Sequence, residues 1–339
     1  MTDHLESEEY IFMKPVYWFI APTALLLVFA AAFSFRNQEK VEAAALVTSS
    51  ASISPDQLAP ALLKGRFDWV YSRMTKELQK EVPKEEFKKL MTQFQKGIVT
   101  YRPEIRYRLN GVQAAIGLSQ DKTKGYQVIY NSSKQISSFI VQSELPSEKK
   151  AAKDLTKNVY SLPFKGDWFV FWGGTNVLVN YHYAIPAQRY AADLVKAVNN
   201  YSYKGDPKKN ESYFAFGQDI MAPKEGIVVE AVDEYEDNFP VGTTNPDNPP
   251  EGNHVVIDHG HGEYSLLAHL KKGSVKVSKG DIVKKGDLLA LCGNSGNSSE
   301  PHLHFQVSDH PVFTEGKSRL VRFEGNPEVL IGRTLKGSK

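Results

Sequence analysis

The sequence predicts an α+β domain and then a mainly-β domain of the antiparallel sheet or sandwich type, both behind an N-terminal transmembrane helix. Three observations lead to this fold class. Residues 16–35 carry no charged side chain. Residues 54–97 show helical periodicity, and alternating strand patterns follow them up to residue 143. Between residues 168 and 307, short apolar runs are separated by turn residues, which is typical of β-rich domains.

The composition of the chain excludes several classes of function and of metal site. The 339 residues include 41 Lys+Arg and 39 Asp+Glu, a formal net charge of +2 that gives no electrostatic basis for nucleic acid as the main partner. The single cysteine, Cys292, excludes an intrachain disulfide framework and a thiolate-rich zinc site. Any metal centre must therefore use carboxylates and some of the nine histidines.

The N-terminal segment predicts a membrane anchor. A helix over residues 16–35 is about 30 Å long, enough to cross the hydrocarbon core of a bilayer. Cleavage as a signal peptide is the alternative, since small residues follow at 43–45. The leader, residues 1–15, is acidic, whereas the corresponding region of signal peptides is positive, so we favour an uncleaved anchor. The flanking charges do not fix its orientation.

An α+β domain is expected over residues 54–143, after an Ala/Ser/Thr-rich tether at 36–53. Its clearest helix has apolar side chains spaced i, i+3, i+4, i+7 from Phe87 to Phe94 and ends at Gly97. Helices come first and strands follow without alternation, which favours α+β layers over a parallel sheet. The expected strands are 105–109, 112–118, 126–130 and 136–141. The region loosely resembles small cone-shaped domains of the nuclear-transport-factor-like type, and this resemblance implies no catalytic residues.

A charged linker at 144–157 leads to the second domain, residues 158–325, and residues 326–339 are expected to form a tail. Residues 237–252 are too rich in Pro, Asn and Gly for a regular element and predict an exposed loop. The expected strands of this domain are 168–172, 177–183, 226–232, 254–258, 264–270, 275–277, 282–283, 288–292 and 304–307.

The histidines of this second domain are the candidate site residues. His302 and His304 are two apart in a strand pattern, so their side chains share one face. Both can bind one metal, or one can serve as ligand and the other in proton transfer. His269 ends another apolar strand.

Residues 216–307 resemble the lysostaphin/LytM-type zinc endopeptidases of the bacterial cell wall. The matching pieces occur in the family's order and include Ala222-Pro223, the Gly252-to-His259 stretch, the His269-Leu pair, Gly293-to-Gly296 and His302-Leu-His304. The resemblance implies that zinc is held by one histidine, one aspartate and the second histidine of His-x-His, which is His304. It also implies that His302 and His269 handle the water and the developing oxyanion.

The remaining two ligands depart from the family's usual spacing. Asp193 is the chosen aspartate, because Asp219 reads as a strand position that leads into the Ala-Pro turn. The usual His-x-x-x-Asp would need histidine at 189, where the sequence has arginine. The nearest candidate is His182, at the end of an expected strand, and a turn around Pro186 would return Asp193 beside it. The alternative is that the site lacks its first ligand.

A complete site would bind Zn²⁺ through His182, Asp193 and His304, with a fourth position left for water. His269 and His302 would then assist proton transfer and oxyanion stabilisation. We expect the other histidines (His254, His259, His261 and His310) to be structural or surface residues, and Cys292 not to be a nucleophile.

The predicted function is a single-pass, extracytoplasmic zinc endopeptidase that hydrolyses peptide bonds in peptidoglycan. The membrane and the peptidoglycan peptide are its expected partners, and protein regulators stay open. The main alternative is a degenerate, non-catalytic module that binds cell wall or regulates a hydrolase. A weaker one is a sugar-binding sandwich whose histidines are incidental.

Overall fold

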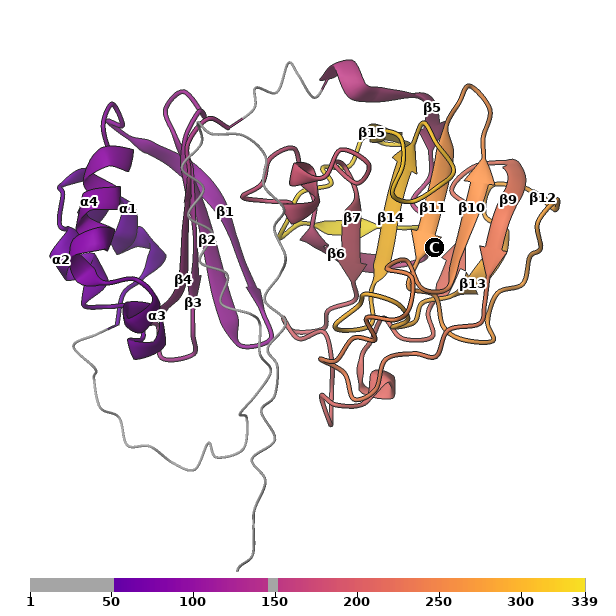
Figure 1. The fold of residues 1–339 in the computed structure, drawn as a ribbon, viewed down its shortest axis with the longest axis horizontal. Coiled ribbons are helices and arrows are strands. Elements are labelled where there is room, and N and C mark those ends of the chain that lie inside the picture. Colours follow the sequence, from indigo (N-terminus) through magenta and orange to yellow (C-terminus); the bar gives the residue numbers. More distant parts are fainter. Residues whose placement is uncertain (1–51, 146–151, 339) are drawn as a thin grey trace, which may run out of the picture.

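The computed structural model describes residues 52–145 and 152–338 (Figure 1). The expected leader and anchor, and nearly all of the tether, lie outside these residues. The helices within the described ranges are all too short or too polar to cross a bilayer.

The N-terminal part is a helical layer on a four-stranded antiparallel sheet of order β1-β2-β3-β4, as its helix-then-strand pattern predicts. Its helices are α1 (Pro55–Leu63), α2 (Phe67–Tyr71), α3 (Lys76–Glu81) and α4 (Lys84–Phe94). Its strands are β1 (Tyr101–Leu109), β2 (Val112–Ser119), β3 (Gly125–Tyr130) and β4 (Ile136–Gln142). The resemblance to nuclear-transport-factor-like domains stays a prediction.

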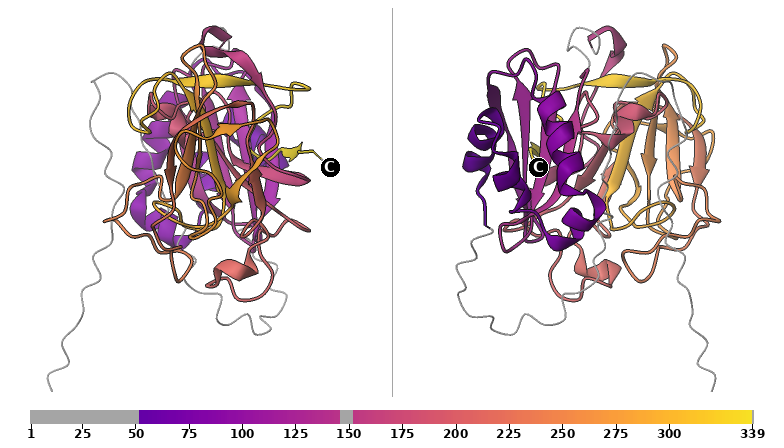
Figure 2. Two further views of the ribbon diagram at one scale, coloured as in Figure 1. Left: turned by 90° about the vertical axis from the view of Figure 1, so that its right-hand side faces the viewer. Right: turned by 60° about the vertical axis from the view of Figure 1, so that its left-hand side comes forward.

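Both faces of this sheet are covered, and alternate residues of β2 serve the two sides. Ala115 packs into the core with the helices, whereas Ile116 packs toward the C-terminal part, together with Leu178 and Ile331. Figures 1 and 2 show the helices on one side of the sheet and the C-terminal domain on the other. The sheet is therefore the middle layer of the molecule.

The C-terminal part is built around a mainly antiparallel sheet with the path β12-β9-β10-β11-β14-β7-β6-β16. β15 pairs with β14 and, in parallel, with β5, while β8 and β13 form a separate pair. Phe305 of β14 and Leu289 of β13 belong to one buried core, so the two sheets pack face to face. The strands are β5 (Leu155–Tyr160), β6 (Asp167–Trp172), β7 (Ala192–Val195), β8 (Asp219–Met221), β9 (Gly226–Val232), β10 (His254–Asp258), β11 (Tyr264–Ala268), β12 (Ile282–Val283), β13 (Leu288–Leu291), β14 (Leu303–Ser308), β15 (Ser318–Phe323) and β16 (Thr334–Lys336).

Short 3₁₀ helices connect some of these strands: η1 (Ala152–Asp154), η2 (Tyr181–Ala184) and η3 (Asn210–Ser212). β5 begins inside the segment expected as a linker, and β16 lies within the expected tail. Both segments are therefore partly built into the C-terminal sheet.

Two strand predictions are wrong for the same physical reason. In residues 177–183, Asn176 Oδ1 accepts from Leu178 N–H, and Asn180 Oδ1 accepts from His182 N–H. In residues 275–277, Asp233 Oδ2 accepts from Val275 N–H. Side-chain oxygens thus take backbone donors that a strand ladder would use.

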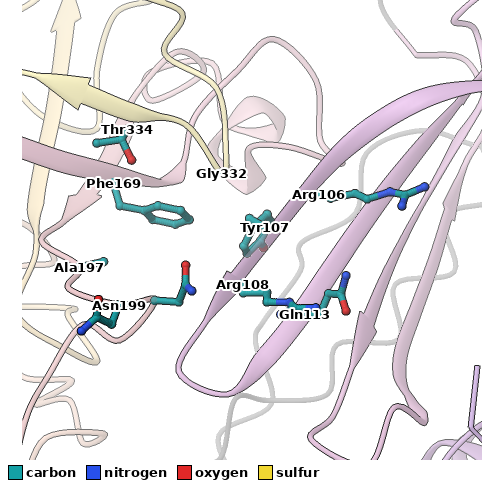
Figure 3. Close-up of a pocket in the computed structure, with 10 residues that line it drawn as sticks. Arg106, Tyr107, Arg108, Gln113, Phe169, Ala197, Asn199, Gly332 and Thr334 are labelled. Atoms are coloured by element: carbon teal, nitrogen blue, oxygen red, sulfur yellow. The ribbon is translucent and has the colours of Figure 1, made fainter. Parts of the chain in front are cut away.

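The two parts of the chain meet through hydrogen bonds and apolar contacts. Asn110, in the β1–β2 turn, donates from its backbone N–H to Asn200 O, and its Oδ1 accepts from Ser202 N–H, both at 2.8 Å. Beside these bonds lies an open pocket of about 480 Å³. Figure 3 shows Tyr107 of β1 and Phe169 of β6 facing each other across it, with ring centroids 5.8 Å apart.

Candidate metal centre

Strand β14 positions the candidate site, because its neighbours on both sides carry site residues. His304 lies opposite Asp193 of β7, and on the other side it lies opposite Ala268 of β11. The residue after Ala268 is His269, and the residue two before His304 is His302. Pairing of β11, β14 and β7 thus brings together residues that are far apart in the sequence.

His182, Asp193 and His304 form a buried group that could hold a metal ion. Each offers one ligand atom, and these atoms lie within 4.8 Å of one another. Asp193 Oδ1 is 3.0 Å from His304 Nδ1, and Asp193 Oδ2 is 3.6 Å from His182 Nε2. The turn expected around Pro186 is present, and His182 and Asp193 meet through it.

His182 lies on the 3₁₀ helix η2, not at the end of a strand as the sequence predicts. Its Nδ1 is 2.9 Å from Asn180 Oδ1. The amide of Asn180 is oriented by its Nδ2, which donates to Ala191 O at 2.9 Å. His182 Nδ1 therefore carries the proton and donates, and its Nε2 lone pair faces Asp193. Burial lowers the pKa of His182 to about 3, against a smaller opposing effect of Asp193.

His304 is oriented by a hydrogen bond at Nε2, whereas His182 is oriented by one at Nδ1. Its Nε2 is 3.0 Å from Gln306 Oε1, while Gln306 Nε2 donates to Ala187 O at 3.1 Å. The amide oxygen of Gln306 must accept, so His304 Nε2 carries the proton. His304 Nδ1, the other ring nitrogen, faces Asp193 Oδ1.

The donor set fits a divalent cation. Two imidazole nitrogens face one carboxylate, and each of the three groups offers one ligand atom to a shared cation. Although burial alone would raise it, the positive charge favoured on His302 holds the pKa of Asp193 well below its usual range. The carboxylate is thus ionised, as a metal ligand must be. Asn180 and Gln306 supply the hydrogen bonds that orient ligating histidines in metal sites.

His269 and His302 lie beside this group, with ring centroids 4.6 Å apart. His269 Nδ1 donates to Ser295 O at 2.9 Å, and His302 Nδ1 donates to Glu300 O at 2.8 Å. The Nε2 atom of each ring is therefore left for chemistry. His269 adopts a φ of +62°, in the left-handed region that is uncommon for residues other than glycine and that often marks functional sites.

The two rings differ in electrostatic environment. Burial, helped by the nearby His302 and His304, lowers the pKa of His269 well below its usual value. For His302 burial acts in the same direction, but the Asp193 carboxylate outweighs it and raises the pKa. His302 Nε2 lies 3.6 Å from Asp193 Oδ1. One imidazole is thus kept neutral while its neighbour favours the protonated form.

A pocket of about 230 Å³ lies beside the group, with Asp193 and His302 in its lining. Asp193 and His302 form one wall, and aromatic side chains form another. Trp172 pairs with Asp193 in the sheet, and its ring makes an edge contact with Tyr181 at 5.4 Å between centroids. The Tyr181 ring in turn lies 3.9 Å from that of His182.

The histidines expected to be structural lie apart from this group. His254 Nδ1 donates to Gly252 O, and His259 bonds both Glu225 O and Ser265 Oγ. His261 occupies a turn with φ +58°, and His310 is part-exposed next to Glu315. Cys292 is buried, which raises the pKa of its thiol, so the structure agrees that it is a poor nucleophile.

One segment of the C-terminal part matches a known protein family. The buried group of His182, Asp193 and His304 could hold a metal ion, and its Asp193 and His304 lie on paired strands of a mainly antiparallel sheet. Residues 212–315 match the model of peptidase family M23. The match begins after His182 and Asp193, and the structure joins these two residues to it.

The relatives share only short segments with this chain. An uncharacterized metalloprotease of Buchnera aphidicola is 39% identical over 85 residues, which are 25% of this chain and 21% of that protein. The peptidoglycan DD-endopeptidase ShyB of Vibrio cholerae is 42% identical over 60 residues, 18% of this chain and 14% of that protein. The chain thus spans about a fifth or less of these relatives. The catalytic domain of lysostaphin from Staphylococcus simulans aligns at 19% identity and TM-score 0.27, over 46% of this chain and 88% of that domain.

Proposed function

We propose that this chain is a zinc endopeptidase that hydrolyses peptide bonds in bacterial peptidoglycan. One observation carries the proposal: ring nitrogens of His182 and His304 converge on Asp193 beside His269 and His302. The match to family M23, and a relative named as a peptidoglycan DD-endopeptidase, supply the reaction class and the substrate. Two nitrogens and one carboxylate oxygen suit Zn²⁺ with one position left open.

His182, Asp193 and His304 would hold the ion in the proposed mechanism. When bound, zinc would supply an activated water at neutral pH and would polarise the scissile carbonyl. His269 Nε2 accepts a proton, because its Nδ1 is already committed to Ser295 O. His302, fixed through Glu300 O, donates from Nε2 to the oxygen on which negative charge develops.

The proposed location follows from the substrate and the anchor. Peptidoglycan lies outside the cytoplasmic membrane, so residues 16–35 would act as a single transmembrane span with the peptidase on the extracytoplasmic side. Secretion after cleavage of this segment is the alternative. Membrane fractionation of cells expressing the full chain distinguishes the two: an anchored chain stays in the membrane after a high-salt or carbonate wash, and a cleaved one is recovered in the soluble fraction.

The test of the enzyme combines metal analysis with substrate digestion. Detergent-solubilised full chain is analysed for zinc and incubated with purified peptidoglycan, and new amino termini are identified by mass spectrometry. We expect about one zinc per chain, and release of amino termini that chelation stops and zinc restores. Failure to bind zinc in excess metal overturns the proposal. Binding of peptidoglycan without new amino termini supports the non-catalytic alternative instead.

A further inference from the structure

The pocket at the metal centre continues toward the N-terminal domain. A second cavity of about 190 Å³ is lined by the same Phe171, Trp172, Ser299 and Glu300 that line the first. Its other walls come from β1, β2 and β3 of the N-terminal sheet, including Leu109. The two cavities thus form a path from the histidines to an apolar surface between the domains, and Glu300 lies where they meet.

Glu300 is a buried acidic residue, and one of its carboxylate oxygens has no hydrogen-bond partner among the residues that the structure describes. The residue is 6% exposed, and this oxygen is Oε1. Its backbone carbonyl accepts hydrogen bonds from His302 Nδ1 and from Ser298 Oγ. These bonds fix the backbone of Glu300 and do not involve its carboxyl group. Burial raises the pKa of Glu300 to about 7, although His302 opposes this rise. Buried acceptors without partners are costly and rare, and they often mark functional positions.

The surroundings of Glu300 favour a positive charge. Phe171, Trp172 and Tyr181 line the same pocket, and aromatic faces attract ammonium groups. Neither cavity has a lysine or arginine among the described residues that line it. Of the acidic groups there, Asp193 faces the imidazoles of the metal centre, which leaves the Glu300 carboxyl for a ligand.

We infer that Glu300 determines specificity by binding a free primary amine of the substrate peptide. In this arrangement the ammonium group donates to the Glu300 carboxylate, while the adjoining apolar part of the peptide lies against Trp172 and the N-terminal sheet. The inference deepens the proposed function and rests on it, since it names the substrate class as peptides that carry an amine close to the scissile bond. A carboxylate–ammonium hydrogen bond in a desolvated site is among the stronger polar contacts.

The test measures binding to the full chain after its metal has been removed with a chelator, so that no hydrolysis is needed. Isothermal titration compares two probes: Nα-acetyl-lysyl-D-alanyl-D-alanine, and the same peptide with its side-chain amine also acetylated. We expect the free amine to bind about tenfold or more tightly. In Glu300→Gln this ratio should fall to about one, with the affinity for the acetylated probe unchanged. Glu315→Gln, on an exposed loop, serves as the matched control and should keep the wild-type ratio.

Each result bears on the inference separately from the enzyme proposal. Equal affinity of the wild type for the two probes, no binding of either at millimolar concentration, or a ratio preserved in Glu300→Gln overturns it. The comparison of probes on the wild type needs no variant, so a folding defect in Glu300→Gln cannot mask the answer. If the wild type prefers the free amine but does not hydrolyse peptidoglycan, the enzyme proposal fails and the inference about Glu300 holds. If it hydrolyses peptidoglycan but shows no preference for the free amine, the enzyme proposal holds and the inference about Glu300 fails.

Discussion

Asp193 and His304 lie directly opposite each other on adjacent antiparallel strands, with Asp193 Oδ1 3.0 Å from His304 Nδ1. Because Gln306 binds the far ring nitrogen of His304, Nε2, the near nitrogen, Nδ1, faces the carboxylate. The sheet register therefore places two groups that can both act as metal ligands directly against each other.

The first prediction concerns the three proposed ligands. Replacing His182, Asp193 or His304 by alanine should reduce bound zinc from about one per chain to near zero, because each supplies one of three protein ligands. Metal content is measured by mass spectrometry after gel filtration. His254→Ala is the matched control, since it removes a buried imidazole outside the group and should keep the zinc. Full zinc content in His182→Ala would show that the first ligand has been assigned wrongly.

The second prediction separates chemistry from metal binding. His269→Ala and His302→Ala should keep the zinc, because neither side chain belongs to the three-residue group. The rate of peptidoglycan hydrolysis should fall about 10²- to 10⁴-fold, the usual contribution of a positioned proton-transfer residue. Metal analysis and digestion are run on the same preparation. Loss of zinc together with activity would make these residues ligands instead.

The third prediction concerns Asn180, which orients His182 and is not itself one of the three proposed ligands. Asn180→Ala removes the acceptor for His182 Nδ1 and should weaken zinc affinity about 10- to 100-fold. Affinity is measured by competition with a chelator. Asn176→Ala is the control, because Asn176 Oδ1 bonds the backbone of the same loop at Leu178 and not the imidazole. An equal loss of affinity in both variants would indicate a general effect of the loop.

The fourth prediction concerns pH and stability away from the site. His259 donates from Nδ1 to Glu225 O at 2.8 Å and accepts at Nε2 from Ser265 Oγ at 2.7 Å, so the folded protein holds it neutral. Burial lowers its pKa. The folded state then binds this proton less tightly than the unfolded chain, whose pKa is about 6.5. His259 thus contributes stability above pH 6.5 that is lost as the pH falls below it.

Thermal unfolding of the metal-free chain from pH 8 to pH 5 checks this sign. His259→Gln should melt several degrees lower at pH 8, since each lost hydrogen bond costs about 1 kcal/mol and each kcal/mol lowers Tm by about 2–4 °C. Its Tm should also depend less on pH than that of the wild type. His310→Gln, which changes a part-exposed histidine, should keep the wild-type pH dependence. A wild-type slope in His259→Gln would contradict the role assigned here.

Local sequence patterns predict much of the fold. Helix periodicity located the helix that ends near Gly97, and strand alternation located the four N-terminal strands, to within a few residues. The apolar spacing of Val70, Met74 and Leu78 suggests one continuous stretch, but the structure has two short helices, α2 and α3, with Met74 between them. The strand expected at 177–183 was wrong because asparagine side chains capture its backbone donors. Periodicity reports burial, and a buried loop with apolar residues carries the same signal.

The site was predictable as far as the resemblance reached. The His-x-His pattern and the apolar run before His269 indicated three of the site residues. Asp193 was preferred to Asp219 because Asp219 leads directly into the Ala-Pro turn of the family. The structure places Asp219 at an exposed strand start, 3.8 Å from Lys165. Asn180, Gln306 and Glu300 were not identified, because their importance depends on tertiary neighbours that spacing does not reveal.

The shared interior between the two halves has a practical consequence for the preparation of the C-terminal half by itself. Cutting the chain near residue 158 would uncover Leu178, Val179 and Ile331, which now pack against Ile116. Such a truncated protein would expose this apolar surface to water and would aggregate. It would also lack the side of the entrance that the first three strands of the sheet provide. Expression clones that start upstream of residue 52 avoid both faults.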